Sequence, residues 1–229
     1  MNNILQNIQF KHDSFERLTP SRGIKFKNSK IIDKTNVNLV HYPNKKILNE
    51  KTFKKYFGLI EDHRIKTFGF EREYLTLISK NGSVLLKFKK GMVGKVNIPQ
   101  RWHNTSFHMT IHNHEFGQIM PSSKDLLRNV SHNVTYGVIT SENRIGVIKF
   151  GSSMYSKRKS LFLNEYNSFI GKMELDFERK YGDTLLRLSD NEYDEKFRKY
   201  IAKNTDKYVN EFNSRLKEYN VEMTYINIK

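Results

Sequence analysis

Residues 112–125 read HNHEFGQIMPSSKD. This stretch follows a strictly alternating segment, Ser106–His112, which predicts a β-strand. It ends in Pro121-Ser122 and Asp125, which predict the start of a helix that continues to about His132. The chain is therefore expected to leave a strand, cross a short loop and enter a helix.

The polar residues of this stretch have the chemistry and spacing of metal ligands. His112 and His114 are separated by one residue, and two such side chains on an extended chain point to the same face. Asp125 lies in the first turn of the predicted helix and can supply a third ligand. Two imidazoles and a carboxylate with one open position are typical of a catalytic zinc site. Such a metal lowers the pKa of bound water to about 7, and a nearby carboxylate must accept the proton.

Each of these residues also has a purely structural explanation. Ser122 and Asp125 satisfy the S-x-x-D capping box, in which a serine caps a helix and the acid bonds back to it. Histidines on a strand are often simply exposed. His108 and Thr110 alternate with His112 and are expected on the same face, beside the ligands or against a neighbouring layer. The conjunction of all these residues at one spacing favours metal binding.

The motif resembles the signature of the JAMM/MPN+ zinc metalloproteases: His-x-His, seven residues, Ser, two residues, Asp. It is most similar to the version in RadC-like proteins and in MPN domains of phage and provirus head-region proteins. EREYLTLISKNGSVLLKFKKG (71–91) resembles the strand and hairpin that precede the motif in this family, and VTYGVITSENRIGVIKF (134–150) resembles the hairpin that follows it. The likeness covers roughly residues 70–150.

The resemblance implies a function and a set of roles. Zinc is held by His112, His114 and Asp125, and Glu73 is the general base. Ser122 steadies the oxyanion while metal-activated water cleaves a peptide or isopeptide amide bond. The implied substrate is a peptide or protein, either a ubiquitin-like protein or a viral structural protein.

Two carboxylates leave alternatives open around this site. Glu71 lies two residues before Glu73 on the same predicted strand face and is an alternative general base. Glu115 replaces the proline that usually follows the second histidine of the family. A glutamate there adds a carboxylate near the metal, which makes the activity less secure than the fold. Glu115 could itself be read as a ligand, but Asp125 already stands where the motif requires the third ligand, so this reading is disfavoured.

The charge of the chain suggests a second class of function. The formal net charge is +16, and residues 1–159 carry all of the excess, at about +17. Such a field favours an acidic partner, although a solvated lysine-rich surface explains it equally well. The alternative function is therefore a non-catalytic MPN-like binding or scaffolding module, associated with nucleic acid or viral particle assembly. A third hypothesis is a structural protein whose metal only holds the loop.

Composition excludes several classes of site. The chain has no cysteine, which excludes disulfides, cysteine–zinc sites and cysteine nucleophiles. No apolar run approaches the roughly 20 residues of a membrane span, and the N-terminus does not read as a signal peptide. The expected location is cytoplasmic, and no membrane partner is expected. The resemblance to phage and provirus proteins leaves a viral or proviral origin open.

The predicted organisation has three parts and belongs to the α+β class (mixed α/β). Residues 1–60 form a basic N-terminal extension, 61–152 an MPN/JAB-like sheet flanked by helices, and 153–229 a helical extension with a closing strand. A hairpin is predicted at Asn81-Gly82. The predicted strands are Gly23–Lys27, Val37–Tyr42, Tyr74–Ile78, Val84–Phe88, Val93–Ile98, Ser106–His112, Val134–Thr140, Arg144–Phe150 and Val221–Ile228. The predicted helices are residues 49–60, Pro121–His132, Leu161–Tyr181 and Glu192–Tyr219.

Overall fold

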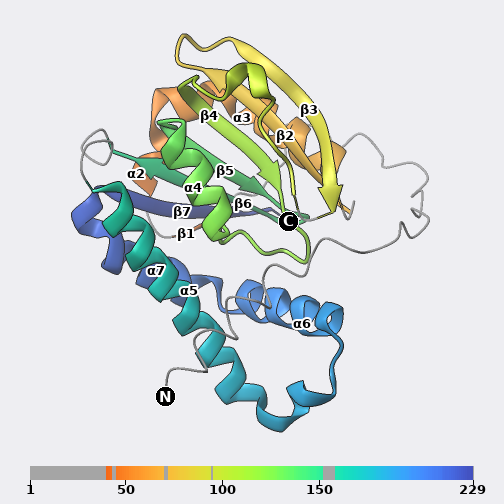
Figure 1. Cartoon of the computed structure of the whole chain (residues 1–229). Coiled ribbons are helices and arrows are strands. Elements are labelled where there is room, and N and C mark those ends of the chain that lie inside the picture. The colour runs from red at the N-terminus through yellow and green to blue at the C-terminus, as the bar shows by residue number, and fades with distance from the viewer. Residues whose placement is uncertain (1–39, 43–44, 70–71, 94, 152–157, 229) are drawn as a thin grey trace. The chain divides into compact units, whose positions relative to one another are not determined.

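The computed structural model describes residues 40–42, 45–69, 72–93, 95–151 and 158–228 (Figure 1). Residues Asn36–Lys229 form one compact unit. The strand predicted at Gly23–Lys27 and most of the basic N-terminal extension lie outside the described residues. The described part of the strand predicted at Val37–Tyr42 forms β1 (Val40–Tyr42).

A mixed seven-stranded sheet organises this unit, in the order β1-β7-β6-β5-β4-β2-β3. Among the described strands, β4 and β5 are parallel and all other neighbours are antiparallel. A sheet combined with helices confirms the predicted α+β class. The other strands are β2 (Arg72–Ser79), β3 (Val84–Val93), β4 (Phe107–Asn113), β5 (Tyr136–Thr140), β6 (Arg144–Phe150) and β7 (Val221–Asn227).

The parallel pair requires a crossover, and α4 (Ser123–Ser131) supplies it between β4 and β5. This crossover is visible in Figure 1, where α4 lies across the sheet between the two strands. It brings the carboxyl end of β4 and the amino end of α4 to the same edge of the sheet. In α/β sheets this edge is where ligands bind.

The β2–β3 hairpin forms as predicted, but the strand predicted after it is wrong. Gly82 takes φ +90 in the turn and donates its N–H to the Ser79 carbonyl at 2.9 Å. β3 then continues to Val93, which pairs with Arg72, and residues 95–98 pair only through one bridge between Met92 and Lys95. The backbone approaches itself closely here: a Cβ on Gly91 would lie 2.4 Å from the Lys95 carbonyl oxygen. The chain therefore folds back at this point and does not continue as an extended strand.

The long helix predicted over Glu192–Tyr219 is also wrong, because it breaks at Asn204 into α6 and α7. Arg144 of β6 explains the break. Its guanidinium donates to the Ala202 carbonyl and, at 3.1 Å, to the Thr205 hydroxyl. The end of α6 is thus tied to the sheet. The helices are α2 (Lys45–Asn49), α3 (Lys51–Thr67), α4, α5 (Lys159–Tyr181), α6 (Asp190–Lys203) and α7 (Thr205–Leu216), with short 3₁₀ turns at Gln100–Trp102, Gly182–Arg187 and Lys217–Tyr219.

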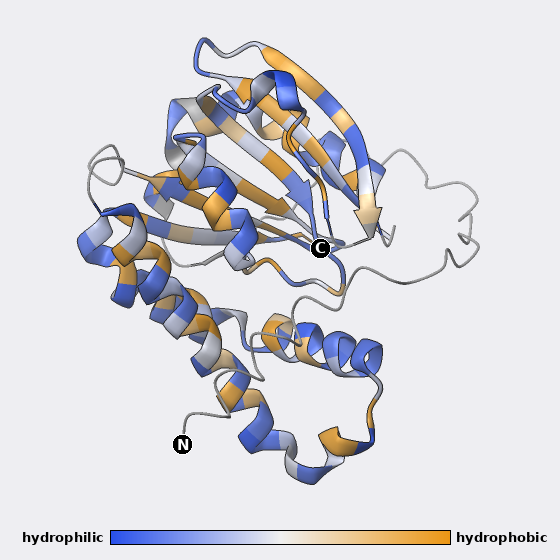
Figure 2. Ribbon diagram, in the orientation of Figure 1, coloured by the Kyte–Doolittle hydropathy of each residue, from blue (hydrophilic) through white to orange (hydrophobic). Residues whose placement is uncertain are grey.

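Helices cover both faces of the sheet, and neighbouring strand residues alternate between the two cores. Val138 packs on the α3 side, whereas Ile139 packs with α4, α5 and α7. Val147 and Ile148 of β6 divide in the same way. Figure 2 shows the resulting run of apolar residues along the central strands. Strands that are buried on both faces are nearly continuously hydrophobic, and every residue of β5 is buried.

The compact unit continues across both predicted boundaries: α3 spans residue 60, and β7, which follows residue 152, lies in the same sheet as β1–β6. The division of the chain into three functional parts stays a prediction. None of the described helices has the length and apolar character needed to cross a membrane.

Two glycines test how closely the loop after β4 packs on the sheet. A Cβ on Gly146 of β6 would lie 3.0 Å from the Ile119 Cβ, whereas one on Gly171 inside α5 meets nothing within 4 Å. Gly146→Val is expected to lower the free energy of unfolding by about 1–3 kcal/mol through overpacking. Gly171→Ala is expected to raise it by about 0.5–1 kcal/mol. Urea unfolding measures both changes, and a Gly146→Val protein as stable as the parent would contradict this packing.

Candidate metal centre

The β4–α4 crossover brings together the three residues predicted as metal ligands. His112 stands near the end of β4, His114 directly follows the strand, and Asp125 lies in the first turn of α4. One ligand atom from each lies within 4.8 Å of the others. The structure therefore contains a His112–His114–Asp125 group that can hold a metal ion.

The distances between the ligand atoms fit a tetrahedral ion. The two Nε2 atoms are 3.1 Å apart. Each ring faces a different Asp125 oxygen: Oδ1 lies 3.2 Å from His112 Nε2, and Oδ2 lies 3.3 Å from His114 Nε2. For zinc–ligand bonds of about 2.0–2.1 Å, the edges of a tetrahedron around the ion are about 3.3–3.4 Å. The three side chains already stand close to the spacing that a shared ion requires.

The group is desolvated, and this sets the charge of its members. The side chains of His112, His114 and Asp125 are 0%, 8% and 6% exposed. Burial lowers the pKa of His112 to about 4 although the Asp125 charge opposes it. Burial alone would raise the pKa of Asp125, but His112 and Arg128 hold it well below its ordinary value. At neutral pH the group therefore offers a neutral imidazole and a carboxylate, the forms that bind metals.

Gln118 orients the second imidazole. The Gln118 side-chain amide donates to the Met120 carbonyl at 2.7 Å, so its oxygen faces the His114 ring and accepts from Nδ1. With the proton on Nδ1, the lone pair of Nε2 points at His112 and Asp125. Burial alone would lower the pKa of His114, but the hydrogen bond and charge of Asp125 outweigh it and raise that pKa.

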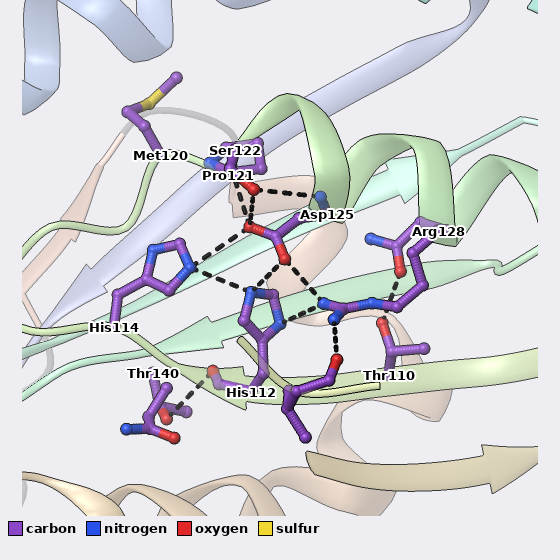
Figure 3. A network of polar contacts seen from close by, with 12 residues as sticks. Thr110, His112, His114, Met120, Pro121, Ser122, Asp125, Arg128 and Thr140 are labelled. Carbon is purple, nitrogen blue, oxygen red and sulfur yellow. Dashed lines mark hydrogen bonds and ion pairs between the residues drawn. The ribbon is translucent and has the colours of Figure 1, made fainter. Parts of the chain in front are cut away.

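Asp125 is held from two sides, as Figure 3 shows. One carboxylate oxygen accepts from the Ser122 N–H at 2.9 Å and from the Ser122 hydroxyl at 2.7 Å. The other oxygen accepts from the Arg128 guanidinium at 2.8 Å. The capping box predicted for Ser122 and Asp125 is thus confirmed, and it coexists with the metal group. The single hydroxyl proton of Ser122 points at Asp125 in this arrangement.

Asn113, the residue between the two histidines, ties β4 to the strand that carries Glu73. Its side-chain oxygen accepts from the Tyr74 N–H at 2.6 Å, and its amide donates to the Arg72 carbonyl at 3.1 Å. These two backbone groups flank Glu73. Because Leu75 pairs with His112 in the antiparallel register, Glu73 stands opposite His114 on the neighbouring strand.

The surroundings of Glu73 make it a weak acid. Burial and, to a smaller extent, the Asp125 charge together raise its pKa to about 7, although His114, Arg128 and Arg198 oppose the shift. A carboxylate with a pKa near neutrality suits general-base catalysis. The alternative base, Glu71, lies outside the described residues.

One prediction about a neighbouring residue is wrong. A β-bulge separates the pairs Ile78–Met109 and Ser79–Phe107 and breaks the alternation of β4. His108 therefore packs between the rings of Tyr56 and Tyr136, 5.8 and 5.4 Å away, rather than beside His112. Thr110 does reach the α4 side, where its hydroxyl donates to Asn129 at 2.8 Å.

Glu115 is not part of the metal group, in agreement with the disfavoured ligand reading. Its carboxylate lies 3.8 Å from the Arg198 guanidinium of α6. Glu115 thus links the loop after His114 to the C-terminal helices.

Comparison with protein-family models, curated proteins and solved structures gave no match. The JAMM/MPN+ resemblance therefore remains a proposal about the residues themselves.

Three residues that support the site were not identified from the sequence as functional. Gln118 lies four residues after His114, and Arg128 lies one helical turn after Asp125, so both spacings carried a signal. Asn113 had none, because its role depends on the pairing of β2 with β4. Gln118 orients the His114 ring, Asn113 fixes the strand beside Glu73, and Arg128 supplies a positive charge next to Asp125. The result is a buried N, N, O donor set with an acid opposite it, an arrangement suited to metal-assisted hydrolysis.

Substitution of the ligands tests the centre directly. His114→Ala, His112→Ala and Asp125→Asn are each expected to weaken cobalt or zinc binding by about a hundredfold or more, since one ligand of three is lost. His108→Ala is the matched control, because it removes a histidine of the same strand that lies outside the group, and it should bind metal as the parent does. Equal binding by His114→Ala and the parent would exclude the site. Isothermal titration calorimetry measures each affinity.

Proposed function

We propose that this chain is a zinc-dependent hydrolase of the JAMM type that cleaves a peptide or isopeptide amide bond. The observation that carries the proposal is the convergence of His112, His114 and Asp125, with one donor atom from each within 4.8 Å of the others and with Glu73 opposite them. The β4–α4–β5 crossover and the preceding β2–β3 hairpin are consistent with an MPN/JAB-like core.

The donor set supports zinc as the metal. Two imidazoles and one carboxylate suit zinc, and three protein ligands leave one position for a reactant. A magnesium or calcium site would be built from oxygen ligands. Zinc bound there would act as a Lewis acid that activates water and polarises the scissile carbonyl.

The proposed roles of the protein side chains follow from their positions. Glu73 accepts the proton of the attacking water and passes it to the leaving amine. Ser122 is exposed, so its hydroxyl can turn from Asp125 toward the developing oxyanion and donate to it. Gln118 and Asn113 act through His114 and through the backbone beside Glu73, and are positioning residues.

Replacement of the proposed base separates catalysis from metal binding. Glu73→Gln is expected to reduce amide hydrolysis by about 10²–10⁴-fold, because it removes the proton acceptor. Its metal affinity should stay within a few-fold of the parent. Its thermal midpoint at pH 8 should equal or exceed that of the parent, because burying the ionised carboxylate costs free energy. Full hydrolase activity in Glu73→Gln would refute this role.

The pH dependence of hydrolysis tests the same carboxyl group. Glu73 must be ionised to accept a proton, and burial raises its pKa to about 7. The rate should therefore increase with pH through an acidic limb at or below about pH 7, since a bound cation opposes the effect of Asp125. This limb should be absent from the residual activity of Glu73→Gln. Measurement of kcat/KM from pH 5 to pH 9 on a peptide-amide library, with saturating zinc, would reveal it.

A further inference from the structure

Arg128 is a partly buried cation, with its side chain 14% exposed, and it is directed at the metal centre. One terminal nitrogen donates to the Val96 carbonyl at 3.0 Å, which anchors the guanidinium from outside the centre. The other terminal nitrogen donates to Asp125 at 2.8 Å and lies 3.3 Å from His112 Nδ1 (Figure 3). The guanidinium therefore touches two of the three proposed ligands.

The contact with His112 opposes metal binding. An arginine nitrogen always donates, so the contact favours a His112 ring with the lone pair on Nδ1 and the proton on Nε2. Nε2 is the atom that faces His114 and Asp125. A metal ion on Nε2 needs the opposite tautomer, which places two N–H groups against each other. The ion would also meet a fixed positive charge in a desolvated site.

We infer that Arg128 is a built-in counter-ion that neutralises Asp125 without metal and weakens the affinity of the centre for divalent cations. This inference rests on the proposed metal centre. Arg128 then lets the buried carboxylate exist in the metal-free protein, and it sets the metal concentration at which the centre fills. Asp125 does not depend on Arg128 for its orientation, because the Ser122 N–H and hydroxyl hold its other oxygen.

The test is cobalt binding by Arg128→Gln, followed by d–d absorption and by competition with a chelator. Loss of the charge is expected to tighten cobalt binding about tenfold to a hundredfold. Loss of a residue that only orients a ligand would instead weaken cobalt binding. The thermal midpoint of the metal-free variant should fall, and the shift that cobalt produces should grow. Lys124→Gln removes an exposed charge from the same helix and should bind cobalt as the parent does. Arg128→Lys, which keeps the charge, should bind within about threefold of the parent.

The outcomes separate this inference from the proposed function. If cobalt binds neither the parent nor the variants, the metal centre itself is wrong. If it binds the parent and Arg128→Gln binds it equally or more weakly, only the counter-ion role fails. If metal-free Arg128→Gln is unfolded, refolding on addition of cobalt supports the inference. Failure to refold overturns it and makes Arg128 a purely structural residue.

Discussion

The side chains of Asp125, His112 and His114 are buried together at the end of β4. The removal of a carboxylate from water costs free energy, and much of the surrounding structure offsets that cost. A buried carboxylate is stable only when it is paired and hydrogen-bonded. Asp125 meets that condition through the Ser122 cap, the Arg128 guanidinium and the two histidine rings. The parallel β4–β5 pair makes the arrangement possible, because its crossover places the amino end of α4 beside the end of β4.

The C-terminal helices contribute to this centre although none of its ligands lies on them. The Tyr166 hydroxyl of α5 donates to the Pro121 carbonyl, immediately before the cap of α4. Arg144 connects the Ala202 carbonyl at the end of α6 to the Gly117 carbonyl in the loop after His114. Glu115 faces Arg198 of α6. A proline after the second histidine would stiffen this loop locally. In this chain, which has Glu115 at that position, long-range contacts restrain the loop instead.

The acid opposite the centre depends on a different constraint. Glu73 comes from β2, and its strand is joined to β4 by the register of the sheet and by Asn113. The same close packing that brings Glu73 near Asp125 partly shields it from water. Position and raised pKa are therefore consequences of one burial. Arg128 and Arg198 oppose the shift, so the charge of this edge is balanced by cations from two further elements.

Local patterns in the sequence determined the elements that carry the site. Strict alternation predicted β4, Asn81-Gly82 predicted the hairpin, and the S-x-x-D box predicted the start of α4. The spacing of His112, His114 and Asp125 predicted the ligand set, because strand and helix periodicities place these residues at the end of one element and the start of the next.

The break of the last long helix at Asn204 was not predictable in this way, because it is made by Arg144, about sixty residues away in the chain. The bulge that turns His108 away and the counter-charge at Arg128 likewise arise from pairing between distant segments. Periodicity describes one segment at a time. Burial, sheet register and the charge of a neighbour exist only once the segments have packed together.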